Sequence, residues 1–186
     1  MKRVGNVHLE TPRLILREFR PSDWKAVHEY ARVPKVSRFM PWGPNTPAQS
    51  RAAVKYFIAC RRKTRRVTYE LAITLKENGR LIGGCGLRVK DEVNLAGDIG
   101  YVLHPDYWNR GLVTEAATFL LDFCFNRLGL HRIWCTHDPR NHASGKVMRK
   151  IGMRREGLMR HHMLQKGRWR DSVFYGILSG DPRPQR

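Results

Sequence analysis

The chain of 186 residues lacks several features that would assign it to common protein classes. Its four cysteines, Cys60, Cys85, Cys124 and Cys135, form none of the close pairs that bind zinc, so we expect no metal site. Cys85 and Cys124 lie in apolar segments, where a thiol packs as a small hydrophobic group in a reducing compartment. No long apolar run follows Met1, so we expect neither a signal peptide nor a membrane span, and a cytoplasmic location.

Acidic residues are also scarce, with 16 Asp and Glu against 35 Lys and Arg and a formal net charge of +19. The basic excess lies at the two ends: residues 1–69 hold sixteen Lys/Arg against four Asp/Glu, and residues 140–186 hold twelve against three. Such a field attracts polyanions and acidic proteins. We therefore expect an acidic or ribonucleoprotein partner and no membrane partner, although a basic surface also confers solubility.

The composition, 41% hydrophobic and 10% aromatic, is typical of a chain that buries a core. With no repeat or interdomain linker, we expect a single domain over 1–186, ordered over about 8–180, as a monomer or homodimer. Local patterns predict the order β-α-α-β-β-β-α-β-α-β-β and hence a mixed α/β sheet. The predicted strands are 13–20, 69–75, 80–89, 98–104, 132–137, 153–163 and 169–178, and the predicted helices follow Pro21 or span 46–62, 114–128 and 141–151.

Short motifs fix several of these boundaries. Thr46-Pro47-Ala48-Gln49 combines a threonine N-cap, a proline at the first helical position and a glutamine at the third, which together form a capping box. Ser22 is the candidate N-cap of the first helix. Asn78-Gly79 predicts a β-hairpin because both residues tolerate positive φ, and Gly129 is expected to end the helix that precedes it.

The most informative segment, Trp108-Asn109-Arg110-Gly111-Leu112-Val113-Thr114, joins a predicted strand to a predicted helix. It matches neither G-x-x-x-x-G-K-[ST] nor G-x-G-x-x-G, which argues against nucleotide hydrolysis and dinucleotide binding. Free N–H groups and the dipole at a helix start stabilise an anion, Gly111 allows close backbone approach, and Arg110 adds charge. The turn is a candidate phosphate site, although a glycine before a helix often marks only the boundary of the helix.

This region resembles motif A of the GNAT acyltransferases, especially the branch similar to the RimJ/RimL ribosomal-protein N-terminal acetyltransferases. There a W-x-x-G-x-[AG]-T-E-A turn follows a G-Y strand; the matching residues are Trp108, Gly111, Thr114, Glu115 and Ala116, whereas Val113 is larger than usual. The resemblance implies a GNAT fold with a splayed cofactor strand. It assigns the pyrophosphate of acetyl-CoA to the turn 108–114, and pantetheine and the thioester oxygen to the backbone of Tyr101, Val102 and Leu103.

A second segment, Asn141 to Met153, resembles the family helix N-x-x-S-x-x-[VL]-M-x-K-x-G-[FM], and the strand T-P-R-L-I-L-R-E-F also matches. Taken alone, Asn141 is a good helix N-cap and Ser144 lies one turn on. The resemblance assigns Asn141 to the pantetheine arm and Ser144 to protonation of the departing CoA thiolate. Together the motifs imply an acetyl-CoA-dependent N-acetyltransferase.

The general base is less evident. Some relatives place a glutamate where the register here puts Met163, which cannot accept a proton. The candidates are His162 with its neighbour His161, Glu70 and Asp98 on adjacent strands, and His104 at the end of the cofactor strand; a packed or surface role fits each histidine as well. Because an α-amine has a pKa of about 7.7–8.0, against about 10.4 for lysine, an N-terminal amine needs a weaker base.

Acceptor binding is assigned to Trp42, which lies in a Pro/Gly-rich loop. The run Arg61–Arg66 is interpreted as a solvated helix end or as a contact for rRNA or an acidic peptide. We expect acetyl transfer to a primary amine, the N-terminal α-amine of a ribosomal-protein-like acceptor. The alternatives are a small-molecule amine acetyltransferase, and a GNAT-fold RNA- or protein-binding module without turnover, which the missing glutamate and the charge would support.

Overall fold

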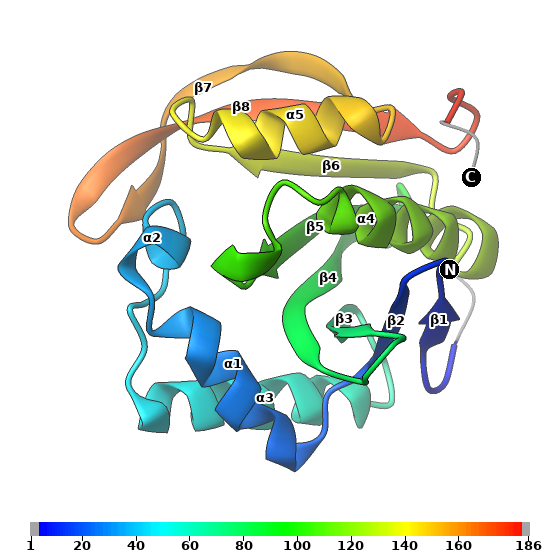
Figure 1. The fold of residues 1–186 in the computed structure, drawn as a ribbon. Coiled ribbons are helices and arrows are strands. Elements are labelled where there is room, and N and C mark those ends of the chain that lie inside the picture. Colours follow the sequence, from blue (N-terminus) through cyan, green and yellow to red (C-terminus); the bar gives the residue numbers. More distant parts are fainter. Residues whose placement is uncertain (1–3, 184–186) are drawn as a thin grey trace.

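One sheet of eight strands organises the computed structural model, which describes residues 4–183, so both ends of the expected domain over 1–186 lie outside the described residues. The strand order is β1-β2-β3-β4-β5-β6-β8-β7 (Figure 1). Neighbouring strands are antiparallel except β5 and β6, which are parallel. The strands are β1 (His8–Glu10), β2 (Leu14–Glu18), β3 (Thr68–Leu75), β4 (Leu81–Asp91), β5 (Ala96–Leu103), β6 (Arg132–His137), β7 (Arg154–Gln165) and β8 (Arg168–Leu178).

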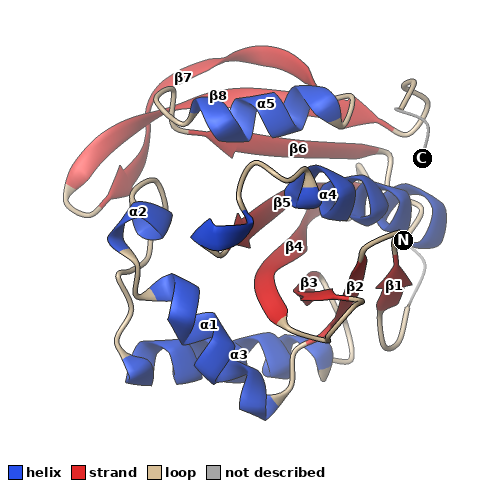
Figure 2. Ribbon diagram, in the orientation of Figure 1, coloured by secondary structure: helices blue, strands red, loops and turns tan. Residues whose placement is uncertain are grey.

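Helices cover both faces of this sheet (Figure 2). One buried apolar cluster lies between the sheet and α1 and α3, and includes Val27, Val54 and Ala72. The larger cluster lies on the other face, where Leu120 of α4 and Met148 of α5 are fully buried. The helices are α1 (Trp24–Ala31), α2 (Pro34–Ser37), α3 (Pro47–Arg61), α4 (Leu112–Asp122) and α5 (His142–Lys150), with 3₁₀ turns at Pro21–Asp23 and Pro105–Tyr107 and a π turn at Phe123–Arg127.

The structure confirms the predicted mixed sheet and its order of elements, with β1 and α2 as additions. The β5–α4–β6 unit has the predicted parallel pairing. β1 escaped prediction because it is only three residues long and pairs with β2 alone. α2 was missed because Pro34, expected only to interrupt a helix, occupies the first position of a new one, where its missing N–H costs nothing.

Local capping is partly as predicted. Gln49 N donates to Thr46 Oγ1 at 3.2 Å and Thr46 N donates to Gln49 Oε1 at 2.7 Å, so the capping box is confirmed. The prediction for Ser22 is wrong: it lies inside the 3₁₀ turn, and Asp23 instead accepts a hydrogen bond from Arg20 N at 2.7 Å. Asp23, the residue directly before α1, makes no side-chain cap hydrogen bond to that helix, and its carboxylate pairs with Arg17 at 2.7 Å.

The hairpin between β3 and β4 is confirmed, although the two turn residues behave differently. Gly79 takes a φ of 71°, whereas Asn78 keeps a negative φ and accepts a hydrogen bond from Arg80 N at 2.9 Å. Gly129 also has positive φ, at 70°, after the helical segment that it was predicted to end. Among the described residues, no helix is long and apolar enough to cross a bilayer.

The basic run after α3 is not uniformly solvated. Arg66 is buried and binds Glu18 of β2 at 2.8 and 3.1 Å, while its guanidinium lies 4.2 Å from the Tyr69 ring centroid. Arg65 remains exposed and pairs with Glu92 at 3.0 Å. Arg66 therefore joins the start of β3 to β2, which the sequence run did not indicate.

Candidate active site

The sheet opens between β5 and β6, which confirms the predicted splay. Only Ala96, Gly97 and Asp98 of β5 pair with β6, opposite Arg132, Ile133 and Trp134. From Ile99 onward β5 pairs with β4 alone. The β6-facing polar groups of Ile99–Leu103 therefore lie along a free strand edge, which includes all three strand residues that the sequence assigned to the cofactor.

The turn at the start of α4 presents unpaired backbone donors. The first intrahelical hydrogen bond runs from Glu115 N to Gly111 O at 3.0 Å, so Leu112, Val113 and Thr114 have no acceptor within the helix. Gly111 has a φ of 75°, which an L side chain rarely adopts, and Asn109 has a φ of 59°. A Cβ at Gly111 would have Arg13 Nη2 as its nearest neighbour, at 3.6 Å. The helix start thus has the features of a candidate anion site.

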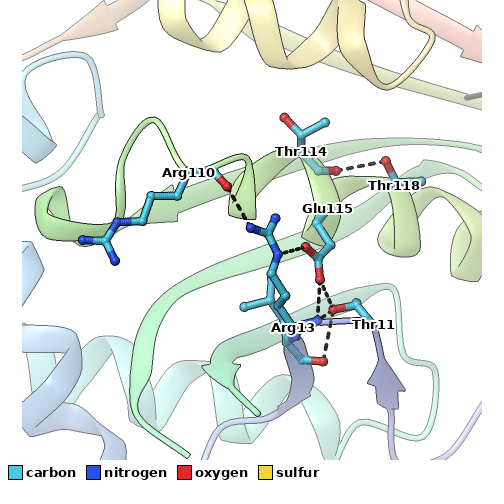
Figure 3. A network of polar contacts seen from close by, with 7 residues as sticks. Thr11, Arg13, Arg110, Thr114, Glu115 and Thr118 are labelled. Atoms are coloured by element: carbon cyan, nitrogen blue, oxygen red, sulfur yellow. Dashed lines mark hydrogen bonds and ion pairs between the residues drawn. The ribbon is translucent and has the colours of Figure 1, made fainter. Parts of the chain in front are cut away.

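Glu115 joins this turn to the connection between β1 and β2, as Figure 3 shows. Its carboxylate accepts hydrogen bonds from Thr11 Oγ1, from Arg13 N at 2.8 Å and from Arg13 Nε at 2.7 Å. Arg13 Nη1 also donates to Arg110 O at 3.0 Å. Burial opposes ionisation of Glu115, but these hydrogen bonds outweigh it and lower the pKa of the carboxyl. Glu115, which the motif comparison matched without a role, holds the turn at Gly111 in place.

The predicted charge beside Gly111 comes mainly from a different arginine. The Arg110 side chain extends away from the Arg13–Glu115 pair (Figure 3) and lies 5.3 Å from the Tyr107 ring centroid. Arg13 brings its guanidinium to the turn instead. The sequence signal for Arg13 was present in the matching T-P-R-L strand, but only the fold shows that this strand lies beside α4.

The other residues of the turn differ in burial, with Trp108 exposed and Leu112 buried. Trp108 Nε1 donates to Leu103 O at 2.8 Å, and Lys35 Nζ lies 5.6 Å from the Trp108 ring centroid. Leu112 is buried and Val113 packs against the same core cluster. The large Val113 side chain therefore packs against the core.

At the start of α5, Asn141 and Ser144 meet Tyr101 of β5. Asn141 Oδ1 caps the helix by accepting from Ser144 N at 3.3 Å, which leaves the Asn141 amide N–H₂ available. The Tyr101 hydroxyl lies 3.0 Å from Ser144 Oγ and 3.2 Å from Ser144 O. Sequence reasoning assigned Tyr101 through its backbone alone and missed its side chain, because nothing local in the sequence relates β5 to α5.

Glu70 occupies a distinctive place on the opposite face of the sheet. Glu70, Gly86 and Gly100 are cross-strand partners on β3, β4 and β5. The Glu70 carboxylate lies over Gly86, where a Cβ would overlap it, and a Cβ at Gly100 would meet nothing within 4 Å. Burial raises the pKa of Glu70 to about 7; nearby Arg88 lowers it and Asp98 raises it further. Among the described residues, no hydrogen-bond donor holds this carboxylate.

The other base candidates are engaged elsewhere. Asp98 is ion-paired with Arg88, and Lys90 Nζ lies 3.8 Å from it. His162 Nδ1 lies 3.0 Å from Ser172 Oγ, and its ring packs on Phe174. His104 and His161 likewise have partners: His104 Nδ1 accepts from Asp106 N at 3.3 Å, and the His161 ring stacks on Trp169.

Trp42 lies on the same face as Glu70. It packs against the apolar cluster of α1 and α3, to which Val102 of β5 also belongs. Near this face, the tip of the β7–β8 hairpin reaches α2, where Lys166 Nζ donates to Ser37 O at 2.8 Å (Figure 1). Met163, the residue that the sequence register placed at the family's glutamate position, pairs with Arg170 in this hairpin.

These features fit acetyl-CoA. The helix start offers donors for a pyrophosphate, the free edge of β5 offers donors for an amide-bearing arm, and the Tyr101–Ser144 pair offers hydroxyls for a sulfur. The two faces of the free edge differ, because Tyr101 packs toward α4 and α5 whereas Glu70 and Val102 lie toward α1 and α3. An amine and a thioester can therefore meet at the edge from opposite sides.

Known proteins share this architecture. Residues 13–154 match the family model of the acetyltransferase (GNAT) domain. The chain is 35% identical over 173 residues to YnaD, an uncharacterized N-acetyltransferase of Bacillus subtilis (strain 168), covering 92% of this chain and 97% of that protein. The crystal structure of a GNAT-family acetyltransferase from Bacillus anthracis has a TM-score of 0.84 at 32% identity, covering 94% of this chain and 100% of that one.

A shorter match concerns a relative with a named acceptor. The [ribosomal protein uS5]-alanine N-acetyltransferase of Escherichia coli (strain K12) is 30% identical over 88 residues, which are 47% of this chain and 45% of that protein. The family model, in contrast, spans most of the chain and includes the splayed strand, the turn at Gly111 and the helix that carries Ser144. The chain belongs to the GNAT family and is an acetyl-transferring enzyme.

Proposed function

We propose that this enzyme acetylates the N-terminal α-amine of a protein, with acetyl-CoA as donor and Glu70 as the general base. The observation that carries the proposal is the Glu70 carboxylate, which lies over Gly86 beside the open space at Gly100. That space borders the free edge of β5, where the thioester would lie. An amine entering from the α1–α3 face comes within reach of the carboxylate.

The pKa of this base matches an α-amine better than a lysine. Glu70 has a pKa of about 7, and an α-ammonium group has a pKa of about 7.7–8.0, so the proton transfer costs about 1 kcal/mol. For a lysine side chain, with a pKa of about 10.4, the same transfer costs more than about 4 kcal/mol. The base therefore favours an α-amine.

The charge of the protein supports an acceptor that is not itself cationic. A net charge of +19 repels polyamines and attracts acidic or nucleic-acid-bound partners. The partial likeness to an alanine N-acetyltransferase of a ribosomal protein makes a peptide that begins with alanine the first acceptor to test. The alternative of a GNAT-fold binding module without turnover depended mainly on the missing family glutamate. Glu70 offers another carboxylate that can act as the base, so this alternative loses its main support.

The roles of the other residues follow from their positions. Acetyl-CoA supplies the acyl group as a thioester. The N–H groups of Leu112, Val113 and Thr114 would hold its pyrophosphate with Arg13 nearby, and the Asn141 amide and the β5 edge would hold its pantetheine arm. Glu70 takes the amine proton, and the Ser144 hydroxyl faces the departing sulfur.

A panel of acceptors tests the proposal. Peptides with alanine, serine or acetyl-blocked N-termini, a lysine peptide with a blocked N-terminus, and spermidine are each incubated with acetyl-CoA, and thiol release is followed. We expect turnover with free N-termini, and none with blocked peptides. Preferred turnover of spermidine or the lysine peptide would refute the acceptor class, and salt-dependent RNA binding without turnover of any amine would refute catalysis by this chain.

A further inference from the structure

The Tyr101 side chain bridges the opening in the sheet. Tyr101 lies on β5 beyond the last residue that pairs with β6, so no β6 backbone hydrogen bond supports the strand there. Its hydroxyl reaches the first turn of α5, where it contacts both Ser144 Oγ at 3.0 Å and Ser144 O at 3.2 Å. Two oxygens of one residue thus compete for a single phenolic proton.

These two contacts define two arrangements of the hydroxyl protons. If Tyr101 donates to Ser144 O, the Ser144 hydroxyl can donate its own proton to the phenolic oxygen, and that proton points away from the site. If Tyr101 instead donates to Ser144 Oγ, the serine proton is free to point elsewhere. A negative charge in front of Ser144 favours the second arrangement, because two aligned O–H dipoles reinforce each other.

We propose that Tyr101 is a positioning residue that orients the Ser144 hydroxyl toward the sulfur of CoA, so that the pair stabilises the thiolate by hydrogen bonds. This inference rests on the proposed function. As the amine nitrogen bonds to the acyl carbon, the C–S bond breaks with its electron pair on sulfur, and Glu70 holds the amine proton. The Tyr101–Ser144 pair supplies no proton of its own in this step.

The surroundings of Tyr101 explain why the pair donates hydrogen bonds and keeps its protons. Burial raises the pKa of Tyr101, Cys135 of β6 raises it further, and the Ser144 hydrogen bond opposes the shift. A thiol has an ordinary pKa of about 8.5, so a proton does not pass from Tyr101 to the thiolate. This differs from the role of proton donor that the resemblance assigned to Ser144.

The pKa of the CoA thiol in its complex with the protein tests the inference without any acceptor. Thiolate absorbance is titrated for the wild-type complex with CoA and for Ser144→Ala, Tyr101→Phe and the double variant, after calorimetry has established binding. We expect the bound thiol to have a pKa below about 8.5 in the wild type. Ser144→Ala should raise it by about one unit and Tyr101→Phe by about half a unit, as loss of single hydrogen bonds implies.

The double variant and a matched control separate orientation from structural support. Because Tyr101 acts through Ser144, the double variant should have the same thiol pKa as Ser144→Ala. Tyr175→Phe is the control, since the Tyr175 hydroxyl also joins α5 to the sheet, through Arg149 Nη1 at 3.0 Å, without contacting Ser144. That variant should leave the thiol pKa unchanged.

The outcomes distinguish this inference from the proposed function. If the wild type binds CoA but Tyr101→Phe leaves the thiol pKa unchanged, the positioning role is wrong while the function stands. A double variant with a higher thiol pKa than Ser144→Ala would also overturn it, because Tyr101 would then act independently. If the wild type binds no CoA, the proposed function itself fails. With an alanine peptide, Tyr101→Phe should lower kcat several-fold and leave the KM for acetyl-CoA unchanged.

Discussion

Replacing Glu70 with glutamine should stabilise the folded protein at alkaline pH while it impairs catalysis. The substitution keeps the shape of the side chain and removes the carboxylate that lies over Gly86. In the native protein this group has a pKa of about 7, raised from 4.5 mainly by burial. Between these two values the folded state holds a proton that the unfolded state has lost.

The sign and size of the stability effect follow from this shift. Because the folded state binds more protons in this window, the contribution of Glu70 to stability is lost as the pH rises from about 4.5 through about 7. At about 1.4 kcal/mol per unit, the full shift corresponds to about 3 kcal/mol. Because glutamine does not ionise, Glu70→Gln does not lose this stability as the pH rises. Its free energy of unfolding, relative to the wild type, should increase by about 2 to 3 kcal/mol between about pH 5 and about pH 8.

The assay is urea unfolding of both proteins at the two pH values, combined with the pH dependence of kcat/KM. The wild-type rate should fall on the acid side of about pH 7 as Glu70 takes up a proton. Glu70→Gln should lose about 100-fold in rate near neutral pH, and should recover partly at higher pH, where the α-amine is already neutral.

Two results would refute this reasoning. A stability difference between wild type and Glu70→Gln that stays constant from about pH 5 to about pH 8 would show that the carboxylate is not desolvated. An unchanged rate in Glu70→Gln, with normal acetyl-CoA binding, would show that another group takes the amine proton. Tyr175→Phe serves as the reference variant, because its hydroxyl bonds Arg149 in a different part of the fold.

Three further substitutions test residues that form or support the site. Gly111→Ala should destabilise the fold by about 1 kcal/mol because of its positive φ, and should weaken CoA binding measured by calorimetry; unchanged affinity would contradict the phosphate site. Glu115→Gln should cost about 1 to 2 kcal/mol at neutral pH, and the loss should fade in urea titrations as the pH falls through the lowered pKa of Glu115; a loss independent of pH would contradict the charged contacts with Arg13. Gly86→Ala should displace the Glu70 carboxylate and lower kcat toward that of Glu70→Gln, whereas a wild-type rate would show that the carboxylate tolerates the methyl group.

The sequence alone determined the elements whose signals are local. The capping box at Thr46 and Gln49, the hairpin at Gly79 and the strand–turn–helix around Gly111 each depend on residues within a few positions of one another. Backbone preferences and short-range hydrogen bonds act at that distance, so a single sequence reveals them. The family motifs around Gly111 and Ser144 are equally local, which is why the reaction class could be predicted.

Only the tertiary structure decided which distant residues meet. Glu70 was one of several base candidates, and it is distinguished by two glycines on neighbouring strands, which leave its carboxylate partly buried and without a hydrogen-bond donor from the residues that the structure describes. Tyr101 reaches Ser144, and Arg13 replaces Arg110 beside Gly111, across separations of 43 and about a hundred residues along the chain. Such contacts depend on strand order and on the divergence of β5 from β6. No local propensity encodes them, because burial and electrostatics act between neighbours in space.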